Sequence, residues 1–237
     1  GLLAVGDLSP ESVKPERDWM TEVSASQNID AKVSLAIEAT NYYLDLYDSE
    51  SANDYIDILR DISANEEEKF SGLKAITLGL AIRSDVISPY EEKSAEQILG
   101  DVTEYLNLQP EEDQAFFNVL NASFPYVLSV DSNEIERIFL KLESYLISGD
   151  RLSELAAVYF QMAYKEGETS ASWLEKAVDV APDDEKNRYR SSLAQEYLLS
   201  KKYDMALSLY DQIHKEENQN GYADLSAYAW AAYKHGN

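Results

Sequence analysis

Apolar side chains recur at three- and four-residue steps along most of the chain. The first run begins at Asp30, which is placed to cap a helix, and continues to Tyr47. A second run follows in "SESANDYIDILRDI", where Ser51 and Asp54 have the spacing of a capping box. Sustained alternation of apolar and polar residues is absent, so the pattern predicts helices and no strands.

Further helix starts are predicted before residue 150 from capping residues, prolines and first-turn acids. They lie at Asn65 with the three glutamates that follow it, at Gln109-Pro110, and at Asp131 with Glu134. Another helix is predicted from Ala95 to Leu106, where apolar residues share one face.

Prolines and a glycine predict where these helices stop. Pro89 disfavours a helical residue before it, and Pro125 predicts a kink or break. Gly149 is the predicted C-cap of the helix that starts near Asp131. Short polar connections between helices are typical of antiparallel helical pairs.

One stretch, "LAQEYLLSKKYDMALSLYDQI", combines small and aromatic residues at fixed offsets. Its first helix is predicted to carry Leu193, Ala194 and Tyr197, and a second begins at Tyr203 and carries Ala206, Tyr210 and Ile213. This pattern resembles the tetratricopeptide repeat, a helix–turn–helix unit of about 34 residues. The resemblance is clearest over 187–216, where we expect the alanines to let two helices approach closely and the tyrosines to fill the space beside them.

The resemblance is weaker over 150–186. Residues 173–184 resemble the end of a repeat, with Leu174, Ala177 and Pro182 at the family's positions. The preceding helix carries Leu155, Ala156 and Tyr159 but is out of step by about two residues, and Gly167 is the expected turn.

The resemblance is also weaker over 219–237. There Ala229, Ala232 and Tyr233 resemble a first helix whose partner is missing. Because such a helix would leave an apolar face uncovered, we expect this repeat to be truncated at Asn237 and further repeats to follow.

The resemblance implies an all-α fold, a right-handed superhelix (solenoid) of antiparallel helix pairs. The chain is predicted to consist of an irregular lead-in over 1–28, a helical region over 29–149, and tetratricopeptide-like repeats over 150–237. Two interpretations of 29–149 stay open: divergent repeats of the same type, or a distinct helical domain. Divergent repeats are favoured because spacing and capping continue without a linker.

Composition narrows the classes of partner. The 237 residues include 20 Lys and Arg against 44 Asp and Glu, which gives a net charge of −24. This charge argues against nucleic acid or an anionic membrane surface, and it is compatible with a basic protein partner or a divalent cation. The chain has no cysteine, which excludes disulfides and thiolate metal sites. No apolar run reaches the roughly 20 residues of a membrane span. The sequence is compatible with a location in the cytoplasm or in the bacterial periplasm.

Residues that could carry catalysis form no recognisable motif. His214 is predicted near the end of a helix and His235 in a turn, and neither has metal-ligand spacing. Acidic pairs such as Asp183 and Glu185 fall at predicted helix starts, where the helix dipole accounts for them. No phosphate loop or nucleophile motif occurs, so we expect no enzyme activity, cofactor or metal.

The expected function is binding. The family resemblance implies that first helices line a concave groove for a peptide or a partner protein. Carried over to the clearest repeat, it places Arg188, Ser191, Gln195 and Leu198 on that groove. The leading hypothesis is a non-catalytic interaction module, a scaffold or adaptor. The alternative is a helical accessory domain of a larger enzyme or of a transport or secretion assembly.

Overall fold

The computed structural model describes residues 17–66, 69–70, 72–88, 93–165, 170–217 and 225–236. Regular structure within these residues is helical throughout, without a strand, which confirms the all-α prediction. The chain divides into two compact units: unit 1 is Gly1–Tyr90 and unit 2 is Glu91–Asn237. The division therefore falls inside the predicted helical region 29–149, and the predicted boundary at 149/150 lies within unit 2.

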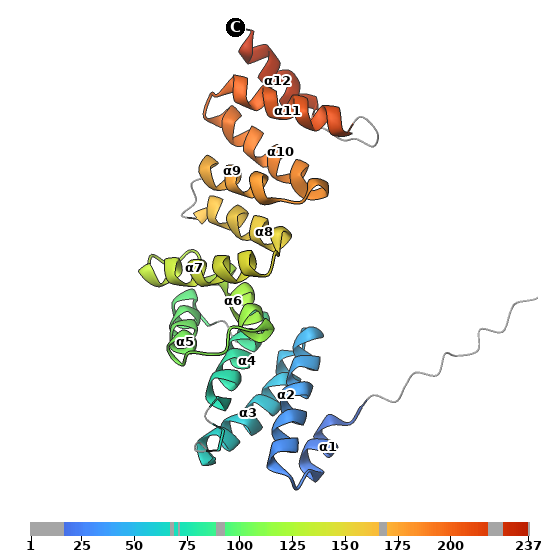
Figure 1. Ribbon diagram of the computed structural model, residues 1–237, viewed down its shortest axis with the longest axis vertical. Helices are drawn as coiled ribbons and strands as arrows, with labels where there is room; N and C mark the ends of the chain where they lie inside the picture. The colour runs from blue at the N-terminus through green and yellow to red at the C-terminus, as the bar shows by residue number, and fades with distance from the viewer. Residues whose placement is uncertain are drawn as a thin grey trace, which may run out of the picture. The chain divides into compact units, whose positions relative to one another are not determined.

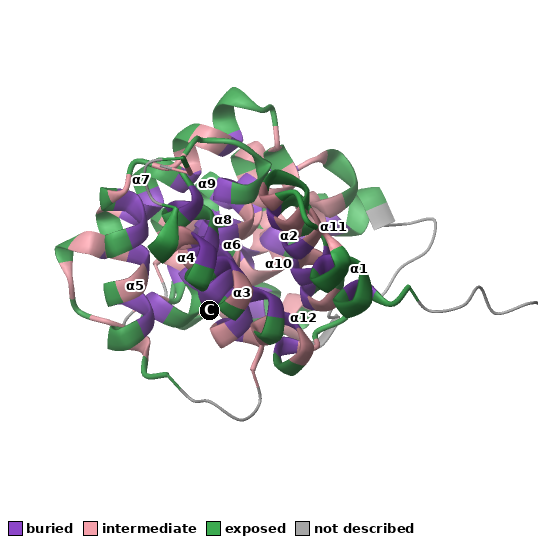
Figure 2. Ribbon diagram, turned by 90° about the horizontal axis from the view of Figure 1, so that it is seen from below, coloured by how far each residue is buried: buried purple, intermediate pink, exposed green. Residues whose placement is uncertain are grey.

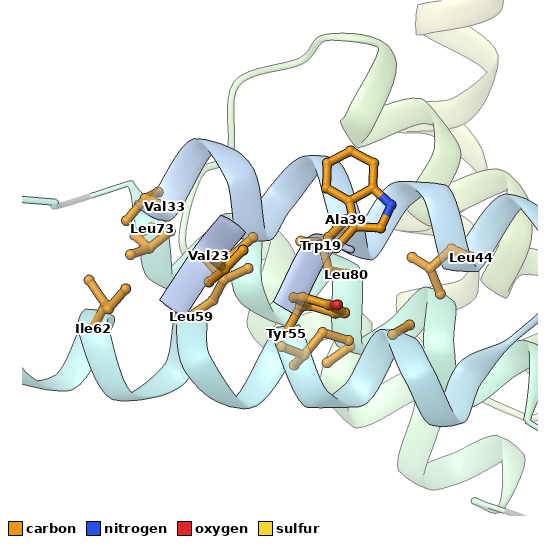
Figure 3. Packing of buried hydrophobic residues seen from close by; sticks show 14 residues of the cluster. Trp19, Val23, Val33, Ala39, Leu44, Tyr55, Leu59, Ile62, Leu73 and Leu80 are labelled. Atoms are coloured by element: carbon orange, nitrogen blue, oxygen red, sulfur yellow. The ribbon is translucent and has the colours of Figure 1, made fainter. Parts of the chain in front are cut away.

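Unit 1 is built on α2, which packs against every other helix of the unit. Its helices, labelled in Figure 1, are α1 (Trp19–Ala25), α2 (Ile29–Asp45), α3 (Ser49–Asn65) and α4 (Leu73–Ile87). Figure 3 shows buried side chains from all four helices gathered in the space between them, with Tyr55 of α3 and Leu80 of α4 among them. This shared apolar cluster is the core of unit 1.

The prediction of an irregular lead-in over 1–28 is wrong for the residues that form α1. Trp19 and Val23 are buried in the core of unit 1. The Arg17 guanidinium lies 3.7 Å from the centre of the Trp19 ring and bonds Glu22 at 2.7 Å and Glu38 of α2 at 3.0 Å. A helix of seven residues is too short to show a clear hydrophobic periodicity in the sequence. It is stabilised by the burial of its apolar side chains and by the contacts of Arg17. Residues 1–16 lie outside the described residues.

Unit 2 contains eight helices in its described residues, and each packs against the next in chain order. They are α5 (Ala95–Asn107), α6 (Gln114–Val127), α7 (Asn133–Ser148), α8 (Leu152–Ala163), α9 (Ala171–Val180), α10 (Asp183–Leu199), α11 (Tyr203–Glu217) and α12 (Leu225–His235). Short connections turn the chain back between packed helices such as α10 and α11 (Figure 1). In Figure 2 the buried residues lie on helix sides that face other helices.

The repeat-like stretch of unit 2 is internal packing, as predicted. The residues predicted to pack inside it, apart from the half-buried Tyr203, are all buried: Leu193, Ala194, Tyr197, Ala206, Tyr210 and Ile213. They form one apolar cluster with Ala163, Leu174 and Ala231. Two alanines with no exposed surface, Ala194 on α10 and Ala206 on α11, belong to this cluster, and the two helices pack against each other.

The register predicted for the last helix is wrong. Ala229, Ala232 and Tyr233 of α12 are exposed, whereas Ala231 is buried and Tyr228 packs against the cluster. The positions of α12 that face the cluster therefore follow the corresponding positions of α10 by about 34 residues. The predicted positions lie two residues too far along the chain. Every residue of "AYAWAAY" is small or aromatic, so the pattern alone does not mark the buried face.

Helix starts differ from the predicted ones by a few residues. The side chain of Asn28, rather than Asp30, caps α2, accepting hydrogen bonds from Asp30 N at 2.9 Å and Ala31 N at 3.2 Å. Asp48, rather than Ser51, caps α3. Asp113 caps α6, and not the predicted start at Gln109-Pro110. Ser132 caps α7 in place of Asp131. Asn65 is the last residue of α3 and does not start a helix.

Helix ends follow the sequence more closely. Gly149 is the C-cap of α7, as predicted, and α6 continues through Pro125 to Val127. A residue with positive φ follows four of the helices: Tyr47, Gln109, Asp150 and Lys201. After α2, α7 and α10 the next backbone N–H bonds a carbonyl five residues back, which closes a Schellman motif. The predicted break at Pro89 and turn at Gly167 lie outside the described residues.

Candidate partner-binding surface

The candidate surface lies on α10, the helix that carries the four predicted groove residues. Its first turn contains Asp183, Asp184 and Glu185, placed at the positive end of the helix dipole. The buried face of α10 packs against α9 and α11 and consists of Tyr189, Leu193, Ala194 and Tyr197. The residues between these positions are half-buried or exposed.

The four predicted residues form a single stripe along α10, at steps of three and four positions. Arg188 and Gln195 are exposed, Ser191 is half-buried, and Leu198 is half-buried against the apolar cluster of unit 2. Within the described residues, no hydrogen bond engages the side chains of Ser191 and Gln195. The stripe thus offers a cation, a hydroxyl, an amide and an apolar edge.

Contacts with α8 hold the N-terminal half of this stripe. The Arg188 guanidinium lies 5.9 Å from the Phe160 ring centre and 5.7 Å from that of Tyr189. Ser153 Oγ of α8 donates to Glu185 Oε1 at 2.6 Å. Sequence reasoning missed Phe160, Ser153 and Glu185 as supports, because each acts across two helices. The Arg188 side chain is therefore exposed and lies beside two aromatic rings.

A glutamine recurs along the two first helices of the candidate repeats. Gln161 of α8 precedes Gln195 of α10 by about 34 positions. Its Oε1 atom is buried without a hydrogen-bond partner among the described residues. Gln195 is exposed, so the two glutamines lie in different surroundings despite the shared spacing.

Tyrosine hydroxyls join three successive pairs of helices in unit 2. Tyr159 of α8 donates to Glu143 of α7 at 2.7 Å, and Tyr197 of α10 donates to Glu175 of α9. The third such bond runs from Tyr228 of α12 to Asp211 of α11 at 3.0 Å. In each pair the tyrosine belongs to the later helix and the carboxylate to the one before it. Each of these bonds links α8, α10 or α12 to the helix that precedes it.

The same contacts change the acidity of the tyrosines. Burial, together with the hydrogen bond to Glu175, raises the pKa of Tyr197 to about 12. The pKa of Tyr159 is raised by burial and by its bond to Glu143. The bond to Asp211 raises the pKa of Tyr228. All three phenols are therefore neutral donors at physiological pH.

Two shallow hollows of unit 2, of about 380 and 530 Å³, border α7 and share Arg137 and Lys141. Arg137 bonds Asn107 at 3.1 Å and Glu134 at 3.2 Å, and Lys141 pairs with Glu112. Both cations are thus engaged within the chain and do not converge on a common point. This arrangement does not resemble a small-molecule site with a few convergent polar groups.

The histidines contribute to helix packing and helix ends. His214 lies in the last turn of α11, as predicted, and stacks on Tyr228 with ring centres 6.3 Å apart. His235 is the last residue of α12 rather than part of a turn, and its Nδ1 contacts the Asp204 carboxylate of α11. Among the described residues, no group of three or more histidine and acidic side chains could hold a metal ion. None of the described helices is long and apolar enough to cross a bilayer.

Comparison with known proteins adds no relative. No family model, curated protein or solved structure matches the chain. The case for a function therefore rests on the chain's own residues and contacts.

Proposed function

We propose that unit 2 acts as a non-catalytic protein–protein interaction module of the tetratricopeptide type. In this proposal α8, α10 and α12 are the first helices of successive repeats, and α9 and α11 are second helices. They wind as a right-handed superhelix, and the first helices line its inner groove. The groove binds a peptide or a segment of a partner protein.

The observation that carries the proposal is the stripe of Arg188, Ser191, Gln195 and Leu198 on α10. Two of its polar side chains have no hydrogen bond within the described residues, and the exposed Arg188 guanidinium lies 5.9 Å from the Phe160 ring centre. A polypeptide presents alternating donors and acceptors along its backbone, which a hydroxyl and an amide can both bind.

Further support comes from a kind of bond that recurs in unit 2. A tyrosine of each proposed first helix, α8, α10 and α12, donates to a carboxylate of the helix before it. Each bond ties a candidate repeat to the helix that precedes it, as stacked repeats require.

The test is a binding measurement with substitutions in the stripe. A partner is captured with the full chain from its source cells, purified, and titrated against wild type and variants. Arg188→Glu and Gln195→Ala are each expected to weaken binding by about tenfold or more, as loss of an interface anchor does.

The matched control is Lys215→Glu, which makes the same charge reversal on an exposed position of α11. It is expected to leave the affinity near that of wild type at moderate ionic strength. If both stripe variants bind as well as wild type, the partner uses another surface and the proposed groove is wrong.

A further inference from the structure

Unit 1 carries an exposed apolar surface at the C-terminal end of α2. Three large apolar side chains are exposed there: Tyr42 at 39%, Leu46 at 58% and Tyr47 at 78%. Tyr42 and Leu46 are four positions apart on the last turns of α2, so they share one side of the helix end. Tyr47 follows directly. We call these three residues the α2 knob.

The base of the knob is rigid. The Tyr42 ring contacts the buried Trp19 ring at 5.8 Å and the Tyr43 ring at 5.2 Å between centres. Tyr43 in turn stacks on Tyr55 of α3 at 5.7 Å. An aromatic surface held by a chain of ring contacts loses little freedom when a partner covers it.

Tyr47 adopts a backbone conformation that disfavours its side chain. Its φ is 57°, in the left-handed region where glycine and asparagine are usual. The Schellman bonds, from Tyr47 N to Leu44 O at 3.1 Å and from Asp48 N to Tyr43 O at 2.9 Å, account for the backbone shape. They do not account for the aromatic ring, because glycine would make them at lower cost.

The other positive-φ residues show how unusual this choice is. Gln109, Asp150 and Lys201 occupy comparable positions after α5, α7 and α10, and all three are polar. Only the end of α2 carries a bulky apolar residue in this conformation within the described residues. A strained aromatic side chain that is 78% exposed contributes little to the core, which indicates a role outside the chain.

The charge around the knob indicates which partner fits. Asp45 is 78% exposed, and Asp48 and Glu50 follow within the next few positions. Two cations lie close by, and both are engaged within unit 1. Arg83, largely buried, lies 3.6 Å from Asp45 and donates to Asn41 at 2.6 Å. Arg17, over the Trp19 ring, is paired with Glu22 and Glu38. The chain as a whole carries −24. A second copy of the chain and an anionic bilayer would both be repelled.

We infer that the α2 knob docks against a basic, amphipathic helix of a partner protein. The partner's apolar face covers Tyr42, Leu46 and Tyr47, and its lysines or arginines meet the carboxylates of Asp45 and Glu50. Tyrosine is among the residues most enriched at interface hot spots, and exposed charges around the rim speed association and fix orientation. This surface lies in unit 1 and does not depend on the α10 stripe.

The test uses the full chain and a synthetic amphipathic helix of leucine and lysine as the probe. Wild type is expected to bind it, with an affinity that falls as salt is added. Tyr47→Gly is expected to weaken binding by about tenfold or more. The same substitution relieves the positive-φ strain, so the thermal midpoint is expected to stay unchanged or to rise.

That combination separates binding from stability, because a purely structural role for Tyr47 would leave affinity for the probe unchanged. Leu199→Ser is the matched control, since Leu199 is 79% exposed at the end of α10 in unit 2. It is expected to bind the probe as wild type does. A helix of leucine and glutamate is expected not to bind.

Three results would overturn the inference. One is an equal affinity of wild type and Tyr47→Gly for the leucine–lysine helix, or no binding by wild type. Another is concentration-dependent dimerisation in sedimentation that Tyr47→Gly abolishes, which would make a second copy the occupant. The third is binding of wild type to phosphatidylserine vesicles that Tyr47→Gly abolishes, which would make the surface a lipid contact.

Discussion

Three tyrosines of unit 2 each link one helix to the helix before it. The chain has 17 tyrosines, and those at 159, 197 and 228 combine a packed ring with a hydroxyl that reaches a carboxylate on the preceding helix. Tyr197 is buried, whereas its acceptor Glu175 is exposed. The ring therefore contributes apolar burial, and the hydroxyl contributes a bond at the protein surface.

Tyr197→Phe keeps the ring and removes the bond to Glu175. Because that carboxylate is exposed and can be solvated, the free energy of unfolding at pH 7 is expected to fall by about 0.5–1.5 kcal/mol. Urea unfolding followed by circular dichroism measures the change. Tyr126→Phe, at a half-exposed tyrosine of α6, is the control and is expected to change little.

The raised pKa of Tyr197 adds a dependence on pH. A phenol whose pKa rises from about 10 to about 12 on folding stabilises the fold fully below about pH 10. That contribution is lost as the pH increases towards 12. The stability difference between wild type and Tyr197→Phe is therefore expected to shrink between about pH 9 and 12. A constant difference across this range would contradict the assignment of the bond.

At the scale of the helices, the caps decide where each element begins. Asp48 Oδ1 accepts from Ser51 N at 3.0 Å, and Asp48 Oδ2 accepts from Ser51 Oγ at 2.6 Å. These bonds hold the pKa of Asp48 below its usual range. Ser51, predicted to be the cap, is thus the donor to it, and Asp54 of the predicted capping box is an exposed residue inside α3.

Asp48→Ala is expected to destabilise unit 1 by about 0.5–2 kcal/mol, the usual cost of losing a helix cap. Asp54→Ala, the matched control, is expected to cost much less. A carboxyl with a lowered pKa stabilises the fold above its ordinary value near 4, and this contribution is lost as the pH falls below it. Urea titrations at about pH 7 and 3 should show the two variants converging at the lower pH; a larger loss for Asp54→Ala would restore the predicted cap.

For the whole molecule, the dominant physical feature is net charge. The 237 residues carry a net charge of −24, so the excess carboxylates repel one another in the folded state. The described ion pairs are mostly exposed, as in Arg60 with Asp57 and Lys69 with Asp30, and exposed pairs contribute little. Self-repulsion is therefore only partly offset by local pairing.

Screening this repulsion is expected to raise the thermal midpoint when sodium chloride is increased from about 0.02 to 0.5 M at pH 7. Differential scanning calorimetry measures the shift. The same salt step near pH 4.3, the isoelectric point of the sequence, is the control and is expected to have a much smaller effect. A lower midpoint in high salt at pH 7 would show that the exposed ion pairs outweigh the repulsion.

The candidate surface was partly predictable. The stripe of Arg188, Ser191, Gln195 and Leu198 follows from helical spacing on α10, because residues three and four positions apart share a helix face. The proximity of Arg188 to Phe160 and the bond between Ser153 and Glu185 join α8 to α10, and no local pattern contains them. The exposed, strained Tyr47 was expected on an apolar helix face, since its spacing from Tyr43 continues the run.

By itself, the sequence determined that the chain is helical and which residues pack inside the repeat-like stretch. Helical periodicity is local, and alanines and tyrosines at 194, 197, 206 and 210 leave one face to bury. Tertiary structure decided the helix starts, the buried face of α12 and the folding of residues 19–25. Several neighbouring side chains could cap each helix, and "AYAWAAY" offers no polar face. In both cases the choice depends on which surface the rest of the fold covers.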